Sequence, residues 1–93
     1  MVTVVADIVS VAAGETLDIK PPTGEEWIIL VITHEYDVEI YHTDGTNPIK
    51  IDSATGNGAW TNLRFPVNET KYLQVKNLDS ANARLIGYSG VKV

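Results

Sequence analysis

One stretch of the sequence limits the possible folds more than any other, because it is apolar on both of its faces. Residues 21–26 have turn chemistry, and the run from Trp27 to Ile32 that follows contains no polar residue. Side chains alternate across a β-strand, which predicts that Trp27, Ile29 and Val31 share one face and the residues between them share the other. One face can form a core, but small antiparallel sheets normally leave the second face in water. The second face therefore predicts a contact with another subunit, for which Trp27, Ile29 and Val31 are the candidate residues.

The length of the chain adds to this expectation. Ninety-three residues fit a single domain over positions 1–93, and a domain of this size buries only about 60–65% of its unfolded surface. The sequence contains no cysteine, so neither a disulfide nor a thiolate-bound metal can stabilise so small a core. Self-association is then the leading source of additional stability.

Apolar residues elsewhere in the chain recur with a period of two, which is the period of a β-strand. Leu17 and Ile19, for example, alternate with the charged Asp18 and Lys20. Turn-forming residues separate about eight such runs at spacings of roughly 8–12 residues, and no segment has a sustained helical period. The expected strands cover residues 3–11, 16–20, 26–33, 36–43, 48–53, 61–67, 71–77 and 83–92. The pattern predicts an all-β fold, either an antiparallel β-sandwich or a jelly-roll-like barrel.

The net charge and the spacing of the histidines and carboxylates argue against several classes of function. The chain has a net charge of −5 and no basic cluster, so neither nucleic acid nor an anionic membrane is an expected partner. His34 and His42 are its two histidines; we expect both at the rim of a sheet, because their spacing is not that of a metal site. The carboxylates alternate with core residues or lie in turns. We therefore expect no enzyme activity, no catalytic residue, no metal ion and no cofactor.

Two other segments are candidates for contact with a partner. The amino-terminal strand is apolar on both faces, which leaves Val2, Val4 and Val5 either as an arm that pairs with a neighbouring subunit by strand addition or as part of an ordinary first strand. Trp60 follows the glycine-rich residues 55–59, which we expect to form the most flexible loop. It is either an exposed partner contact or a loop tryptophan that closes one end of the sandwich.

Two stretches of the chain resemble small structural proteins of tailed phages. Residues 9–28 read VSVAAGETLDIKPPTGEEWI and look like the start of such proteins, and residues 85–91, LIGYSGV, are similar to their carboxyl ends. The family contains compact β domains, among them trimeric decoration (cement) proteins of phage heads and related fibre modules. The resemblance implies a homotrimer that binds the major capsid protein and stabilises the expanded shell.

The same resemblance implies a location. The protein would be assembled in the host cytoplasm and would end on the capsid surface of the virion. A head- or tail-fibre module is the alternative within structural proteins. From a different class comes a carbohydrate-binding module, in which Trp60 and exposed tyrosines would stack on a glycan.

Overall fold

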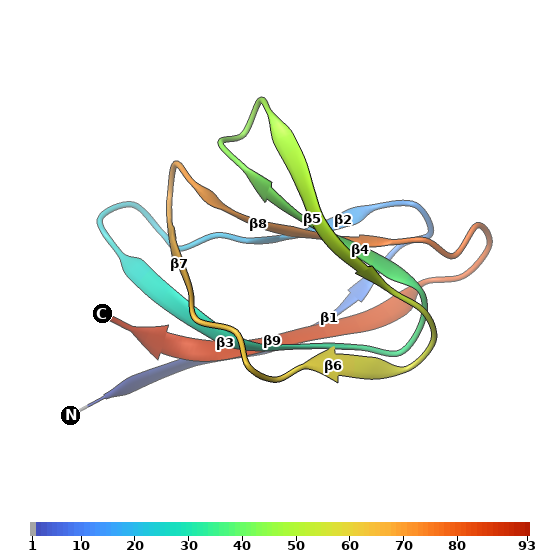
Figure 1. Cartoon of the computed structure of the whole chain (residues 1–93), viewed down its shortest axis with the longest axis horizontal. Coiled ribbons are helices and arrows are strands. Elements are labelled where there is room, and N and C mark those ends of the chain that lie inside the picture. Colours follow the sequence, from blue (N-terminus) through green and yellow to red (C-terminus); the bar gives the residue numbers. More distant parts are fainter. Residues whose placement is uncertain (1) are drawn as a thin grey trace.

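Nine strands and no helix make up the part of the chain that the structure describes. The computed structural model describes residues 2–93. The strands are β1 (Thr3–Val11), β2 (Thr16–Ile19), β3 (Glu26–His34), β4 (Val38–Thr43), β5 (Pro48–Ala54), β6 (Gly58–Trp60), β7 (Phe65–Asn68), β8 (Tyr72–Asn77) and β9 (Arg84–Lys92). They form two antiparallel sheets that face each other (Figure 1). The predicted all-β sandwich is confirmed, and within residues 2–93 no strand pairing joins the sheets into a closed barrel.

The order of the strands follows from a long hairpin that is rolled up. The first half of the chain pairs with the second: β1 with β9, β2 with β8, β3 with β6 and β7, and β4 with β5. Rolling this hairpin brings β9 beside β3 and β8 beside β4. The resulting sheets have the orders β1-β9-β3-β6, with β7 also beside β3, and β2-β8-β4-β5. This is the strand order of a jelly roll in which β6 and β7 are two pieces of one strand.

The break between β6 and β7 corrects the sequence prediction. One strand was expected over 61–67 after a flexible loop over 55–59, but β6 begins inside that loop and β7 begins later than expected. Between the two pieces, the Leu63 N–H donates to the Leu30 carbonyl at 3.1 Å and keeps the chain beside β3. Gly58, which suggested a loop, lies in β6 and packs closely on the His34 ring, which would lie 3.3 Å from a Cβ at this position.

A β-bulge in β3 corrects a second prediction, the distribution of its side chains between the two faces. The pairing of β3 with β9 shifts register between Ile29 and Val31, so Leu30 is an extra residue. Ile29 and Ile32 are therefore both fully buried in the core, while Val31 is partly exposed on the opposite side. Trp27 packs against the core like Ile29, so the prediction that Trp27, Ile29 and Val31 share one face is wrong for Val31.

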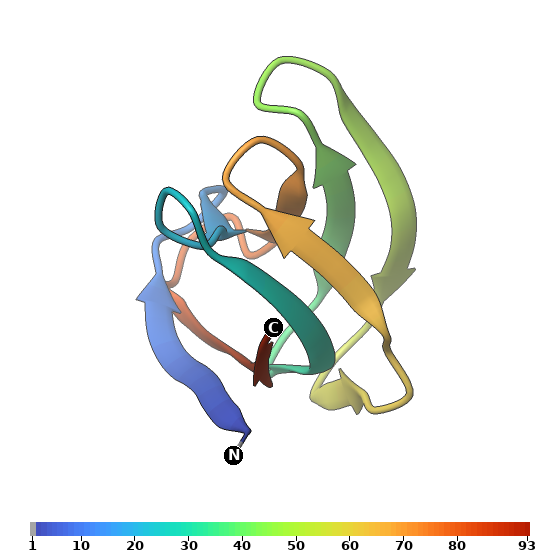
Figure 2. The same ribbon diagram turned by 90° about the vertical axis from the view of Figure 1, so that its left-hand side faces the viewer.

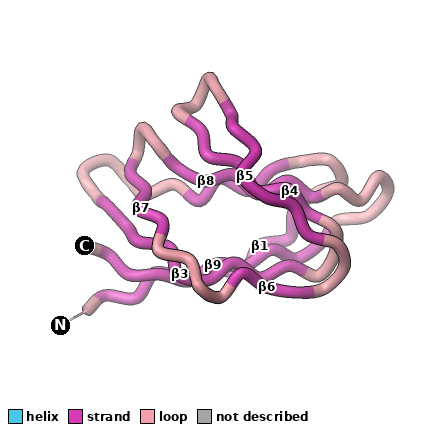
Figure 3. Tube along the Cα trace, in the orientation of Figure 1, coloured by secondary structure: helices cyan, strands magenta, loops and turns pink. Residues whose placement is uncertain are grey.

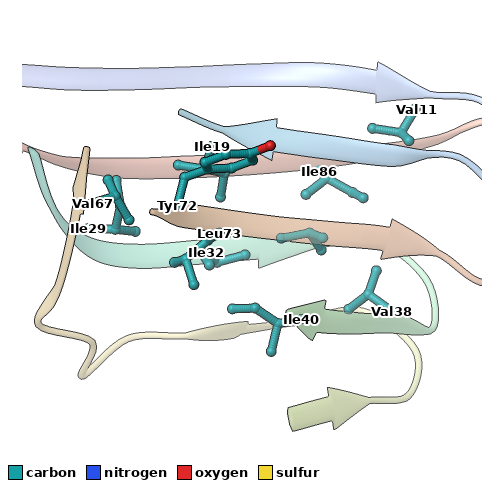
Figure 4. Packing of buried hydrophobic residues seen from close by; sticks show 11 residues of the cluster. Val11, Ile19, Ile29, Ile32, Val38, Ile40, Val67, Tyr72, Leu73 and Ile86 are labelled. Carbon is teal, nitrogen blue, oxygen red and sulfur yellow. The ribbon is translucent and has the colours of Figure 1, made fainter. Parts of the chain in front are cut away.

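The core lies between the two sheets and is aliphatic apart from one tyrosine. Figure 4 shows its side chains, which are Val11, Ile19, Ile29, Ile32, Val38, Ile40, Val67, Tyr72, Leu73, Val75 and Ile86. A buried amide closes one end of it. Asn77 Nδ2 donates to the carbonyls of Val11 at 2.9 Å and Asn82 at 3.1 Å, and Asn77 Oδ1 accepts the N–H of Asp79 at 2.9 Å. The predicted turn over 77–82 is thus anchored to the end of β1.

Candidate interaction surface

The outer side of the five-stranded sheet carries a single charged side chain within its strands, that of Glu26 at the first position of β3. Residues that lie opposite each other in antiparallel strands project on the same side of a sheet, so the register shows which side chains face outward. Ile86 of β9 faces the core, and its neighbours Leu85 and Gly87 therefore face out. Apart from the pair Glu26 and Asn68 at its end, the outward residues are Val4, Ala6, Ile8 and Ser10 of β1, Leu85, Gly87, Ser89 and Val91 of β9, Ile28, Val31 and Thr33 of β3, Ala59 of β6 and Pro66 of β7. We call this set the apolar face.

Several of the largest side chains of the apolar face are open to solvent. Val4 is 68% exposed, Ile8 71% and Leu85 47%. An isolated exposed aliphatic residue is normal, but a contiguous patch of them on a soluble protein marks an interaction site. The sequence therefore indicated correctly that this sheet has a second apolar side, although the bulge changes which residues belong to it.

The outer side of the four-stranded sheet is different, because it is built from charged and polar residues that bind one another. Glu39 Oε2 lies 2.9 Å from Lys50 Nζ, and the hydroxyl of Tyr41 donates to Glu39 Oε1 at 2.6 Å. These two partners, Tyr41 first, lower the pKa of Glu39 below its ordinary value. On the neighbouring strands, Gln74 Nε2 donates to Asp18 Oδ1 at 2.8 Å. One sheet thus has the composition of a solvated surface and the other has that of an interface.

Two shallow hollows lie in the apolar face along β9, where the side chains are small. The larger, of about 350 Å³, includes Ser89 in its lining, and the smaller, of about 270 Å³, includes Leu85. Ile8 and Thr33 line both hollows and form a ridge between them. A Cβ on Gly87 would lie 2.6 Å from Thr33 Oγ1 and 3.2 Å from Ile8 Cγ1. Glycine at this position therefore lets the two ridge residues close over β9.

A second group of exposed aliphatic side chains lies on β5, the edge strand of the other sheet. Ile49 is 63% exposed and Ile51 is 44% exposed. Figure 3 shows that the hairpin of β4 and β5 projects from the rest of the sandwich, and Figure 2 shows it on the opposite side of the molecule from β1. We call Ile49 and Ile51 the β5 patch.

Of the three candidate interface residues, only Val31 lies on the apolar face. Ile29 is in the core. The ring of Trp27 stacks on that of Tyr88 with the centroids 6.2 Å apart, and its indole N–H donates to Glu25 Oε1 at 3.2 Å. The bulge at Leu30 separates Val31 from Trp27 and Ile29, so the three candidates do not form one surface.

The amino-terminal candidates belong to an ordinary first strand. β1 pairs with β9 over its whole length, from Thr3 opposite Lys92 onward, so the alternative of a free arm is wrong. Val4 faces outward on the apolar face, while Val5 faces inward and is partly buried. Val2 precedes the strand and is 68% exposed.

Trp60 lies in β6 and packs inward rather than toward a partner. Its indole N–H donates to Asp52 Oδ2 at 2.8 Å, and its ring lies 5.2 Å from the His34 ring, centroid to centroid. The hydrogen bond from Trp60, followed by that from the Ser53 N–H, lowers the pKa of Asp52 below its ordinary value. Trp60 therefore closes the sandwich beside β5, although from a strand and not from a loop.

The histidines are held by packing. His34 ends β3, as expected, but is buried, and its Nδ1 lies 2.8 Å from the Gly56 carbonyl and 3.1 Å from that of Tyr36. Nδ1 therefore carries a proton and donates it to these oxygens. The His42 ring packs edge-on against Phe65 with the centroids 5.0 Å apart.

No three carboxylate or imidazole side chains among residues 2–93 gather closely enough to hold a metal ion. The same part of the chain contains no helix that is long and apolar enough to cross a membrane.

Comparison with known proteins gives no relative from which a function can be transferred. No model of a known protein family matches the chain, and a search of curated proteins found no match.

Proposed function

We propose that this protein is a non-enzymatic structural subunit, a capsid decoration protein of a tailed phage, which assembles through its apolar face into a homotrimer. The observation that carries the proposal is the contrast between its two sheets. One outer side is charged and internally paired, and the other has one charged residue, Glu26 at its end, and exposes Val4, Ile8 and Leu85. Burial of an exposed aliphatic side chain of this size contributes about 1.5–3 kcal/mol before the costs of association.

The size of the apolar face agrees with a stable interface. Its three longest strands have nine residues each, which at about 3.3 Å per residue gives a length of about 30 Å. Four strand positions about 4.8 Å apart give a width of about 19 Å, and hence about 570 Å² of flat area. Side chains make the accessible area larger than the flat area, so each copy approaches the roughly 800 Å² of a standard interface.

Net charge also favours contact through this face. Each copy has a net charge of −5, so two copies repel each other unless their contact avoids the carboxylates. The apolar face has few carboxylates, with Glu26 at its end and Asp7 and Glu35 beside its two hollows. The charged sheet is then left toward solvent, as expected for a protein on the outside of a particle.

The assignment to phage heads rests on the resemblance of residues 9–28 and 85–91 to small virion proteins. The mechanism would be mass action: a protein that binds the expanded shell, and not its precursor, stabilises the expanded shell. This mechanism requires a rigid, multivalent binder and no catalytic group. A head- or tail-fibre module is the nearest alternative and would use the same apolar face for assembly.

A carbohydrate-binding module is less well supported. Such a module needs aromatic rings whose faces are free for sugars, but the indoles of Trp27 and Trp60 both pack inward and donate to carboxylates. Glycan binding therefore serves as the competing outcome of the test below.

Three measurements test the proposal. Light scattering at micromolar concentration should give three times the mass of the 10.2 kDa chain. The tagged protein should retain the major capsid protein encoded beside it on its genome, and it should retain nothing on a glycan array. A monomer would contradict the assembly, and retention of glycans without the capsid protein would contradict the decoration role.

A further inference from the structure

Asn57 and Gly58 form the one Asn-Gly pair of the chain and lie at the turn into β6. We propose that Asn57 is a site of spontaneous modification, at which the folded protein loses ammonia and gains an aspartate or isoaspartate residue. The reaction needs water but no enzyme and no bound group. It is independent of the self-assembly proposed above, because its reacting atoms belong to two neighbouring residues of one chain.

The backbone nitrogen of Gly58 is the nucleophile of this reaction. It attacks Cγ of Asn57, the bond from Cγ to Nδ2 breaks, and Nδ2 leaves as ammonia with the proton of the Gly58 N–H. Cγ and the Gly58 nitrogen are then joined in a succinimide ring. Water opens the ring at one of its C–N bonds: cleavage at Cγ leaves aspartate, and cleavage at the backbone carbonyl leaves isoaspartate.

The structure leaves Asn57 open to this attack. Its side chain is exposed, at a bend between β5 and β6. Both of its neighbours, Gly56 and Gly58, are glycines, so no Cβ hinders the approach of the nitrogen to Cγ. β6 has three residues and lies at the edge of its sheet. A short edge strand opens locally at a small cost in free energy, which gives the backbone of Gly58 the freedom that ring closure needs.

Every other asparagine of the chain precedes a residue that carries a side chain. Asn68 Oδ1 also accepts two backbone N–H groups within its turn, and Asn77 is buried with its amide bonded. Asn62 is exposed, as Asn57 is, but Leu63 follows it and its branched side chain shields the backbone nitrogen. Asn62 is therefore a matched comparison within the same region of the chain.

Asp44 and Gly45 form a pair that could close the same ring, but the structure protects it. Asp44 Oδ1 accepts the N–H groups of Thr46 at 2.9 Å and Asn47 at 2.7 Å, and Asn47 Nδ2 donates to Asp44 Oδ2 at 3.0 Å. The side chain of Asn47, followed by these backbone groups, lowers the pKa of Asp44 to about 2. At neutral pH the carboxylate is thus ionised, and an ionised carboxylate resists attack by a nucleophile.

The conversion of Asn57 changes a segment that is anchored on both sides. The carbonyl of Gly56 accepts a hydrogen bond from His34 Nδ1 at 2.8 Å, and Gly58 is paired with His34 in the sheet. Isoaspartate adds a carbon to the backbone between these two anchors, so one of them must shift. Either product also adds a carboxylate to the lining of the smaller hollow, which already includes Glu35.

Peptide mapping tests the proposal on the folded protein, which is kept at mildly alkaline pH well below its melting temperature. Trypsin releases residues 51–64, which contain both Asn57 and Asn62. We expect a mass gain equal to the exchange of NH₂ for OH, located at position 57 by fragmentation, and methylation of the product by an isoaspartate methyltransferase. The rate at Asn57 should exceed that at Asn62 at least about tenfold, which corresponds to about 1.4 kcal/mol in activation free energy.

Two controls make the result decisive. Protein digested without incubation gives the background from the digestion itself. Asn57→Gln should keep its mass, because glutamine would have to close a larger ring, which forms far more slowly. If Asn57 stays intact in the folded protein, while the urea-unfolded chain converts, the fold protects this residue and the proposal is overturned. Equal rates at Asn57 and Asn62 would overturn it as well, and neither result depends on the mass of the oligomer.

Discussion

The amide of Asn77 holds together three chain segments at one end of the sandwich. Its donors and its acceptor are all satisfied inside the protein, so Asn77→Ala leaves the carbonyls of Val11 and Asn82 and the N–H of Asp79 without this partner. We expect the free energy of unfolding to fall by about 2–4 kcal/mol. Urea denaturation should show a lower midpoint with an unchanged slope. Asn82→Ala is the control, since that side chain is exposed and should change stability by less than about 0.5 kcal/mol.

Asp79 makes the stabilisation by the same turn dependent on pH. The N–H of Ala81, then the Arg84 side chain at 2.7 Å, lower the pKa of Asp79 to about 2. Because the pKa is about 3.9 in an unfolded chain, the ionised carboxylate stabilises the fold fully above about pH 4. This contribution is lost as the pH falls from about 4 toward 2, where Asp79 becomes protonated in the folded state too.

We predict that the free energy of unfolding of Asp79→Asn falls less steeply than that of the wild type as the pH decreases from about 4 to 2. Thermal unfolding at several pH values measures this slope. Asp44 also has a pKa of about 2, owing first to the side chain of Asn47, so the slope should become smaller without vanishing. A variant with the wild-type slope would contradict the role of Asp79.

On the edge strands β1 and β5, an aspartate carboxylate binds the backbone N–H of the next residue. The carboxylate of Asp7 binds the N–H of Ile8 on β1, which is a long, proline-free strand rich in valine. Removing that carboxylate frees a backbone donor on an aggregation-prone edge. We therefore predict that Asp7→Ala aggregates faster than the wild type on mild heating, as followed by light scattering and thioflavin fluorescence.

A matched control separates this effect from the loss of one negative charge. Asp18 lies on β2, also an edge strand, but binds the side chain of Gln74 and not a backbone N–H. Asp18→Ala removes the same charge and should aggregate at nearly the wild-type rate. Equal acceleration in both variants would attribute the effect to net charge alone.

The sequence predicted most strands and missed features that depend on distant partners. The expected run 3–11 is β1, because an apolar pattern with a period of two is a local property. The extra residue Leu30 has no local signal, since every residue around it is apolar and the bulge appears only against β9. Gly58 suggested a loop, because the His34 ring on which it packs closely is distant in sequence. The order of strands likewise depends on pairings between the two ends of the chain.

For the whole molecule, the chief asymmetry is between the two outer sides of the sandwich. Glu39, Lys50 and Asp18 bind partners on one side, whereas the strands of the other side present one charged residue, Glu26 at the end of β3. Neither the composition nor the net charge reveals this, because both average over the two sheets. The bulge and the register together determine on which side each side chain of this sheet lies.

This assignment gives opposite predictions for two neighbouring residues of β3. Ile29→Asp places an unpaired carboxylate in the core, which costs on the order of 3–5 kcal/mol, and the chain should unfold. Val31→Asp places it on the apolar face, so the fold should persist while the oligomer dissociates. Thr16→Asp, an exposed residue on β2, should change neither property.

Circular dichroism and light scattering, measured at the same concentrations, distinguish these results. Wild-type protein should show a melting temperature that rises with concentration, because only the assembled state is stabilised by mass action. Val31→Asp should remain folded and melt at a temperature that no longer depends on concentration. A folded Ile29→Asp variant would contradict the position of the core, and a Val31→Asp variant that keeps its full mass would show that the apolar face does not hold the subunits together.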